Sequence, residues 1–410
     1  MHQTTLVSFS KMVVWHSLKH SFGKLKIIKK EKTMKSLVIW LGLSTFATIM
    51  TLSAYGQNSD IIGPSPYDYV TDSWMQTFAE EGMTFGGTSG VYVQNKGRIF
   101  FLQRGETRLP NPVPQSYAGF PASLGWNVLQ GRGRVWQNVI YVANSEGEVL
   151  EIWNQWDHLF KGTNGPGPHR LRMSPYDPQN RLWLVDETNH IIYVFSNDGG
   201  RLEMTLGEKG IPGKDETHYR LPQDVAFLPN GMFLVGDGLG GNNRIVVRNA
   251  DGSYHSEFGE GGDAFHQFAS VHSLAMGPEQ KLYALDRDKR DVKVFRQTAA
   301  LDSVDYPNYE YETTWTGLDL PLDITLGEDA AWVTDIRPPK IVKYNLDGTQ
   351  DYVWNLPTEG PHMWIEMHSL SADEEGNLYG TDNQAGRPQK MVQRRDADPD
   401  HIVPRPWFEN

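Results

Sequence analysis

The chain has 410 residues, 40 glycines, 24 prolines, 11% aromatic residues and no cysteine, and its net charge is −12 at pH 7. The absence of cysteine excludes disulfides, thiolate metal sites and cysteine nucleophiles, so any transition metal needs His, Asp, Glu or carbonyl ligands. Residues 1–56 carry +7, from eight lysines and one glutamate, which leaves −19 for residues 57–410. Because such an acidic body repels phosphate backbones, we expect no nucleic-acid partner.

A segment near the N-terminus has the pattern of a secretory signal. After Met34, a lysine precedes an apolar run over residues 37–52, and a cleavage pattern ends at Gly56. This order predicts a signal peptide over residues 34–56 and an exported protein, either periplasmic or secreted. The run is shorter than the roughly twenty residues of a membrane span, so we expect no span after cleavage, with an uncleaved anchor as the alternative.

One phrase recurs along the rest of the chain: an apolar strand, a polar turn, a second apolar strand that ends near an acidic residue, and a third strand. Its copies begin at His169, Gln223, His272, Leu322 and His368, at intervals of 54, 49, 50 and 46 residues. A period of this length is typical of small antiparallel sheets that stack around an axis as the blades of a β-propeller. A further copy begins at Val91, and its distance of 78 residues from His169 leaves room for an inserted hairpin around residues 135–153.

The repeats predict an all-β protein with a six-bladed β-propeller over residues 81–404, in which the first blade is enlarged. A seven-bladed ring is the alternative, if the insertion forms a blade of its own. The remaining parts are an upstream extension from a mis-assigned start over residues 1–33, the signal peptide over 34–56, and an N-terminal segment over 57–80.

Histidine begins the phrase in alternate copies, at His169, His272 and His368. Alternate blades of a six-bladed ring stand about 120° apart, so the three imidazoles converge if the phrase begins on the innermost strand. Three nitrogen ligands with an open fourth position are typical of a catalytic zinc site, although iron, copper, manganese and nickel also accept three histidines. The alternative is that each histidine only caps a strand or packs beside the channel.

Two arginines and a set of aspartates fall at related positions of the repeat. Arg104 ends the second strand of the first blade, and Arg287 follows Asp286 at the matching place of the fourth. Either guanidinium could clamp a carboxylate or stabilise an oxyanion beside a metal, or instead pair with a neighbouring acid. An aspartate recurs at one repeat position, for which we expect a structural role, in five blades: Asp186, Asp237, Asp286, Asp335 and Asp382.

Around these residues the chain resembles the peptidyl-α-hydroxyglycine α-amidating lyase family of NHL-repeat propellers, and specifically its exported bacterial relatives. The resemblance covers roughly residues 81–404. Family phrases of the form PHGL, PHSL and PHDI match GPHRL at His169, VHSL at His272 and MHSL at His368. The resemblance implies a zinc ion on these histidines and catalytic arginines at Arg104 and Arg287.

The resemblance also implies a calcium site on the main-chain carbonyls of Val91 and Leu171 and on an aspartate after the third histidine. Here that residue is Ser369, which removes the carboxylate that a hard cation prefers. The family's catalytic tyrosine is absent too, because DGLGGNNR places Leu239 or Gly240 at its position. Glu366, two residues before His368, is the candidate base in its place, with a solvated surface glutamate as the alternative.

Three hypotheses about function follow. The first is a zinc-dependent lyase that splits a peptidyl-α-hydroxyglycine into a peptide amide and glyoxylate. The second is a zinc propeller with other chemistry, a lactonase or other hydrolase, or a lyase on another small carbonyl or sugar-derived compound. The third is a non-catalytic secreted NHL-type binding module. We expect a monomer and, for the two enzymes, a small-molecule or peptide substrate.

Overall fold

The computed structural model describes residues 59–70, 74–75, 77–125, 133–298 and 308–408. The predicted upstream extension and signal peptide lie outside these residues. Within the described part, no helix combines the length and the apolar character that a membrane crossing requires. The helices are short 3₁₀ turns: η1 (Ser59–Ile61), η2 (Pro121–Leu124), η4 (Asn154–Leu159), η5 (Pro278–Gln280) and η6 (Pro399–His401).

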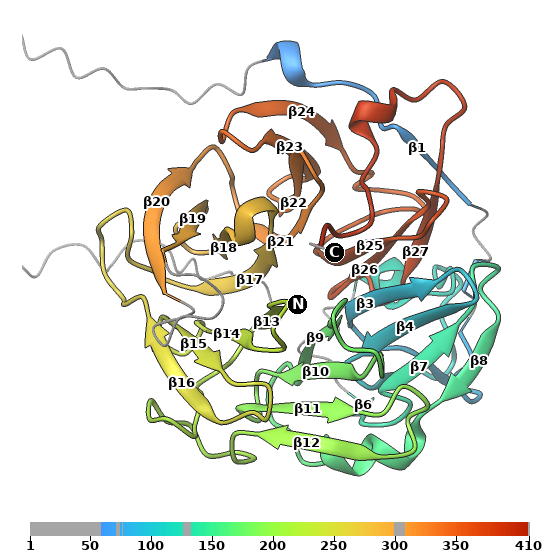
Figure 1. Ribbon diagram of the computed structural model, residues 1–410. Helices are drawn as coiled ribbons and strands as arrows, with labels where there is room; N and C mark the ends of the chain where they lie inside the picture. The colour runs from blue at the N-terminus through green and yellow to red at the C-terminus, as the bar shows by residue number, and fades with distance from the viewer. Residues whose placement is uncertain (1–58, 71–73, 76, 126–132, 299–307, 409–410) are drawn as a thin grey trace, which may run out of the picture. The chain divides into compact units, whose positions relative to one another are not determined.

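Six four-stranded antiparallel sheets surround a central axis (Figure 1), which confirms the predicted six-bladed β-propeller. The first three blades, each from its innermost to its outermost strand, are β3 (Thr88–Asn95), β4 (Arg98–Gln103), β7 (Ile140–Ala143) and β8 (Val149–Ile152); β9 (Pro168–Met173), β10 (Leu182–Asp186), β11 (Ile191–Phe195) and β12 (Leu202–Leu206); and β13 (Asp224–Phe227), β14 (Phe233–Asp237), β15 (Arg244–Arg248) and β16 (Tyr254–Phe258). The last three are β17 (Val271–Met276), β18 (Leu282–Asp286), β19 (Asp291–Gln297) and β20 (Tyr309–Trp315); β21 (Pro321–Leu326), β22 (Ala330–Ile336), β23 (Pro339–Asn345) and β24 (Gln350–Asn355); and β25 (Met367–Ala372), β26 (Leu378–Asp382), β27 (Gln389–Gln393) and β1 (Tyr67–Tyr69).

Each blade buries both of its faces against its neighbours. Successive side chains of a strand point to opposite faces, so a continuous apolar run serves two interfaces at once. In β10, Leu182 and Leu184 pack into the cluster shared with the first blade. Trp183 and Val185 pack into the cluster shared with the third blade. This burial on both faces explains why the strands appear in the sequence as continuous apolar runs and not as alternating apolar and polar residues.

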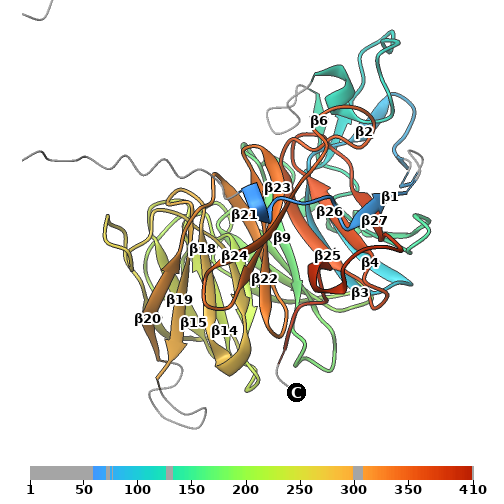
Figure 2. The ribbon, with the colours of Figure 1, turned by 90° about the horizontal axis from the view of Figure 1, so that it is seen from above.

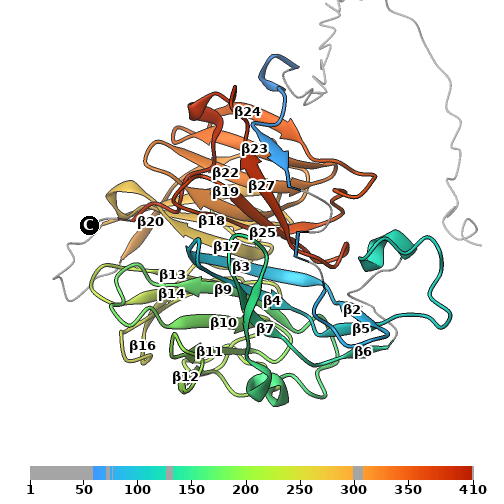
Figure 3. The same cartoon turned by 90° about the vertical axis from the view of Figure 1, so that its right-hand side faces the viewer.

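A small sheet stands beside the first blade and is not part of the ring. It consists of β2 (Met83–Phe85), β5 (Glu106–Arg108) and β6 (Arg134–Val135). Figures 2 and 3 show it on one face of the propeller, opposite the face where the C-terminal segment ends. The insertion therefore lies between β4 and β7, over residues 104–139, and not around residues 135–153 as expected. Residues 140–152 instead supply the two outer strands of the first blade.

The ring is closed by strands from the two ends of the described chain. β1 pairs with β27 as the outermost strand of the sixth blade, with Tyr67 opposite Gln393. Tyr67 is buried, packs in the cluster between the fifth and sixth blades, and accepts a hydrogen bond of 2.8 Å from the backbone N–H of Val403. The sixth blade thus also contains β1, whose residues precede the predicted repeats.

We expect Tyr67→Ala to lower the free energy of unfolding by about 3–4 kcal/mol, because it removes a buried aromatic ring at the closure. Asp68→Ala is the matched control, since Asp68 lies on the same strand with an exposed side chain and should change stability by less than about 1 kcal/mol. Urea unfolding followed by tryptophan fluorescence measures both. Equal effects of the two substitutions would show that β1 does not hold the ring closed.

Candidate metal centre

The three predicted histidines lie near the start of the innermost strands of alternate blades. His169 is on β9, His272 on β17 and His368 on β25, and all three are buried. The ring centroids of His169 and His272 are 4.8 Å apart. The centroid of His368 lies 4.5 Å from that of His169 and 5.4 Å from that of His272. One ligand nitrogen of each lies within 4.8 Å of the others. The alternation in the sequence therefore produces one cluster on the axis.

Each imidazole is oriented by a main-chain carbonyl of the next blade around the ring. The Nδ1–carbonyl distances are 2.8 Å for His169 and Gln223, 2.7 Å for His272 and Leu322, and 2.7 Å for His368 and Ser89. Because a carbonyl oxygen only accepts hydrogen bonds, each Nδ1 carries a proton and donates it. In a neutral ring this leaves the lone pair on Nε2, the atom that is free to bind a metal.

The histidine cluster has the charge state and the spacing of a divalent metal site. Burial lowers the pKa of all three imidazoles well below the usual value, and for His169 the neighbouring His368 and His272 add to this effect. The Nε2 atoms of His169 and His272 are 3.3 Å apart. Two facing lone pairs repel one another at this distance, whereas nitrogen ligands at about 2.0–2.1 Å from a tetrahedral ion are separated by roughly 3.3 Å. Among the described residues, no carboxylate joins the group.

Four of the five recurring aspartates, Asp237, Asp286, Asp335 and Asp382, accept backbone hydrogen bonds from the loop that leads into the innermost strand of their blade. Asp286 accepts hydrogen bonds from the backbone N–H groups of Ala269 and Ser270, just before His272. Asp382 accepts four, from Ile365, Glu366, Gln384 and Ala385. Their role is structural, as expected, and it also holds the backbone before two of the three histidines in place.

Arg104 lies beside the histidine cluster but is already paired. It is buried, its Nε donates to the carbonyl of Pro168 at 3.1 Å, and its guanidinium lies 3.0 Å from the carboxylate of Glu187. Its charge helps to lower the pKa of all three histidines. Arg104 therefore lies near the histidine cluster, as expected for a catalytic arginine, and also forms an ion pair with an acid, which was the alternative expectation.

Arg287 and Glu366 lie on loops at the histidine end of the propeller axis, which we call the mouth: Arg287 follows β18, and Glu366 directly precedes β25. Arg287 is 27% exposed and contacts Asp288 at 2.9 Å, and after burial its charge is the largest contribution that lowers the pKa of His272. Glu366 is half-buried and accepts hydrogen bonds from the side-chain amides of Asn383 and Gln384. It is thus neither a free surface glutamate nor a deeply buried one.

Glu187 and Gln223 belong to the site and were not predicted. The side-chain NH₂ of Gln223 donates to Glu187 at 2.9 Å, while the main-chain carbonyl of Gln223 accepts from His169. Gln223 therefore connects a histidine to the Glu187–Arg104 pair. A signal existed in the sequence, since Glu187 follows the recurring aspartate as Arg287 does, at the repeat position that faces the mouth.

The position of the missing tyrosine is filled by a tight loop. Leu239 and Gly240 are half-buried there. A Cβ atom on Gly240 would lie 2.4 Å from Cγ of Arg220 and 2.6 Å from its carbonyl oxygen, so the loop leaves no room for a side chain at that residue. The loop as folded presents no phenol at this position.

The residues of the implied calcium site do not fit calcium. Ser369 is buried, and its hydroxyl has no hydrogen-bond partner among the described residues. The nearby axial carboxylate of Asp323 already contacts two guanidinium groups, with Arg170 at 3.1 Å and Arg172 at 3.1 Å. Burial alone would raise the pKa of Asp323, but these two cations hold it below the usual value. Val91 and Leu171, whose carbonyls are the predicted ligands, lie on the innermost strands β3 and β9, and the layer of these strands along the axis already contains buried positive charge.

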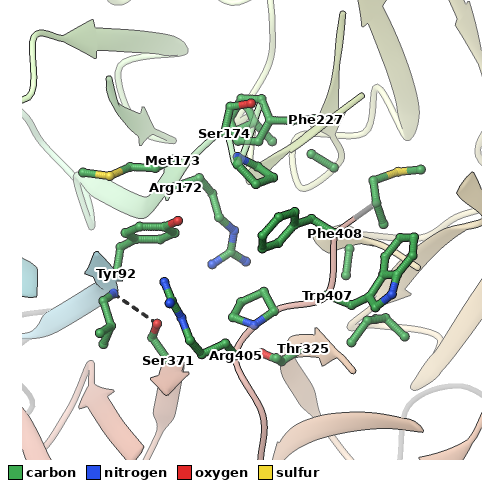
Figure 4. Close-up of a pocket in the computed structure, with 18 of the residues that line it drawn as sticks. Tyr92, Arg172, Met173, Ser174, Phe227, Thr325, Ser371, Arg405, Trp407 and Phe408 are labelled. Atoms are coloured by element: carbon green, nitrogen blue, oxygen red, sulfur yellow. Dashed lines mark hydrogen bonds between the residues drawn. The ribbon is translucent and has the colours of Figure 1, made fainter. Parts of the chain in front are cut away.

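A cavity of about 280 Å³ occupies the opposite end of the channel (Figure 4). Its walls come from the ends of the innermost strands, whereas the histidines lie near the starts. Arg172 faces it from β9, and Arg405, Trp407 and Phe408 of the C-terminal segment cover it. The backbone N–H of Trp407 donates to the carbonyl of Leu326 at 2.7 Å and anchors that segment.

Comparisons with known proteins support the resemblance to amidating lyases. The chain is 26% identical over 228 residues to a Caenorhabditis elegans protein named "Probable peptidyl-alpha-hydroxyglycine alpha-amidating lyase", covering 55% of each. It is 31% identical over 221 residues to a mouse peptidyl-glycine alpha-amidating monooxygenase, covering 52% of this chain and 20% of that protein. The chain thus matches about half of the first relative and a fifth of the second. No protein-family model matches it. Among solved structures, a streptogramin B lyase is similar with a TM-score of 0.44 and 15% identity, over 79% of this chain and 100% of that one.

We expect His169→Ala, His272→Ala and His368→Ala each to abolish stoichiometric metal binding, because each removes one of three neutral nitrogen ligands. Metal analysis after gel filtration measures the content per chain. His255→Ala is the control, since His255 lies on the outermost strand β16, away from the axis, and should leave the metal content unchanged. Retention of the metal by any of the three axial variants would contradict the centre.

We expect Asp382→Ala to destabilise the protein by about 3 kcal/mol or more and to weaken metal binding, because four backbone donors lose their acceptor and His368 is displaced. Asp347→Ala is the control, an exposed turn aspartate that accepts from the backbone and hydroxyl of Thr349. Its loss should change the Tm little and leave the metal content unaffected. Thermal unfolding and a metal-chelator competition assay measure the two effects, and unchanged metal affinity in Asp382→Ala would refute the positioning role.

Proposed function

We propose that this chain is an exported, zinc-dependent β-propeller lyase. The observation that carries the proposal is the buried triad of neutral histidines, whose Nε2 lone pairs converge on the axis beside two arginines and an acid. The relatives named as amidating lyases support the reaction class, and the N-terminal basic and apolar pattern supports export. The first substrate class to test is a peptidyl-α-hydroxyglycine, a hydroxylated carbon bonded to an amide nitrogen and a carboxylate.

His169, His272 and His368 would hold the metal through Nε2, with the Nδ1 hydrogen bonds fixing each ring. A bound divalent ion would supply Lewis-acid polarisation of a substrate oxygen and lower the pKa of a hydroxyl. Among the described residues no fourth His, Asp or Glu side chain joins the three, so a coordination position of the ion would remain for that oxygen.

Glu366 would transfer the proton of the substrate hydroxyl, and Arg104 and Arg287 would offset the negative charge of the substrate. In the reaction the substrate hydroxyl loses its proton, a carbonyl forms at that carbon, the carbon–nitrogen bond breaks, and the departing nitrogen gains a proton. Glu366 would accept the hydroxyl proton and return it to the nitrogen, and the amides of Asn383 and Gln384 orient its carboxylate. Arg287 and the remaining donors of Arg104 would bind the substrate carboxylate.

The pairing of Arg104 with Glu187 favours a second candidate. A guanidinium that already faces a buried carboxylate attracts a second carboxylate less strongly, so a substrate without a free carboxylate is better matched to this mouth. Lactone hydrolysis, or lysis of another small carbonyl or sugar-derived compound, meets this condition. Both candidates use the same histidine centre.

We expect the zinc-loaded protein to release glyoxylate from an α-hydroxyglycine peptide, and Arg287→Ala to lower kcat/KM by about 100-fold. Arg296→Ala is the control, since Arg296 pairs with Glu310 on the exposed edge of the fourth blade and should retain full activity. If no glyoxylate appears, the amidating reaction is wrong for this chain. A panel of lactones and sugar-derived carbonyl compounds then tests the second candidate, with turnover required to disappear in His272→Ala.

A further inference from the structure

We propose that the guanidinium of Arg170 permanently occupies a second cation position on the propeller axis, so that the hub of this chain is held together without calcium. Arg170 follows His169 directly, and the residues at the same repeat position in the other blades form a ring one step along the axis from the histidines. That ring consists of Gly90, Arg170, Asp224, Ser273, Asp323 and Ser369.

Arg170 crosses the axis from the second blade and binds the blades on the far side. It is fully buried, with 0% exposure. Its guanidinium donates to the main-chain carbonyl of His368 at 3.0 Å and to that of Leu322 at 3.0 Å, and it lies 3.1 Å from the carboxylate of Asp323 and 3.8 Å from that of Asp224. Two carboxylates and two main-chain carbonyls are the oxygen ligands that a calcium ion would collect. Here a side chain collects them instead.

The charges in this layer are balanced without an added ion. Arg172 supplies the second positive charge, with its guanidinium 2.7 Å from Asp224 and 3.1 Å from Asp323. The hydroxyl of Ser273 lies 2.9 Å from each of these carboxylates and bridges them. Two arginines and two aspartates thus sum to zero, so a divalent cation would leave two uncompensated positive charges in a buried site.

The sequence differences at this layer are two matched exchanges. In the family that the chain resembles, the phrase PHGL has glycine at the position of Arg170, and the phrase PHDI has aspartate at the position of Ser369. This chain has arginine and serine at these two positions. One exchange adds a positive charge to the axis, and the other removes a negative charge. Either change disfavours a bound cation, and together they replace it.

The test measures thermal stability and calcium binding in the zinc-loaded protein. For the wild type we expect the same Tm in calcium-free buffer and in excess calcium, and no calcium retained after gel filtration. For Arg170→Gly/Ser369→Asp we expect a lower Tm in calcium-free buffer and a saturable increase with added calcium, because two axial carboxylates lose a counter-charge and a third is added. Magnesium should not replace calcium, since it requires a smaller and more regular site.

Two single variants keep the test decisive if the double variant does not fold. Ser369→Asp adds the carboxylate while Arg170 remains, and we expect no response of its Tm to calcium. Arg170→Lys keeps a positive charge, and we expect no response there either. A calcium-dependent Tm in the wild type, in Ser369→Asp or in Arg170→Lys would overturn the proposal, as would a folded double variant that does not respond to calcium. Failure of the lyase assay would leave these results unaffected, because none of them depends on turnover.

Discussion

The hydrogen bond from each histidine Nδ1 to a carbonyl of the next blade is the interaction on which the site depends. It is made three times, between the second and third, fourth and fifth, and sixth and first blades. Each bond fixes a tautomer and a ring direction, yet its acceptor belongs to a different sheet from the histidine itself. The chemistry of the centre is therefore a property of the ring, and no single blade could hold an imidazole in this orientation.

Beneath the histidines, the axis of the propeller is a column of opposite charges. Arg170 and Arg172 come from one blade, while Asp224 and Asp323 come from the third and fifth blades and Ser273 from the fourth. Buried charges are costly unless they are paired and hydrogen-bonded, and here each pair joins separate blades. This layer ties together the innermost strands and separates the histidine mouth from the cavity at the opposite end.

The sequence predicted the features that repeat and missed those that pair across repeats. The apolar strands and the alternation of His169, His272 and His368 recur at a fixed spacing, so the six blades and the cluster could be predicted without coordinates. The pairing of Glu187 with Arg104 joins residues 83 positions apart on different blades, and nothing local to either residue indicates it. Similarly, β1 carries too few residues to show a repeat of its own, so its place beside β27 became visible only in the fold.

The closure of the ring by β1 and β27 separates the two partners by more than 320 residues of chain. During synthesis β1 emerges early and has no partner until β27 follows it, while five blades can already pair internally. After β27 has formed and until β1 docks on it, the sixth blade is short of one strand and presents an open edge, which accepts any extended segment of suitable sequence. The segment with the best match in a crowded population is β1 of a neighbouring copy. Exchange of β1 between copies, giving a swapped dimer, is therefore a misfolding route that this closure permits.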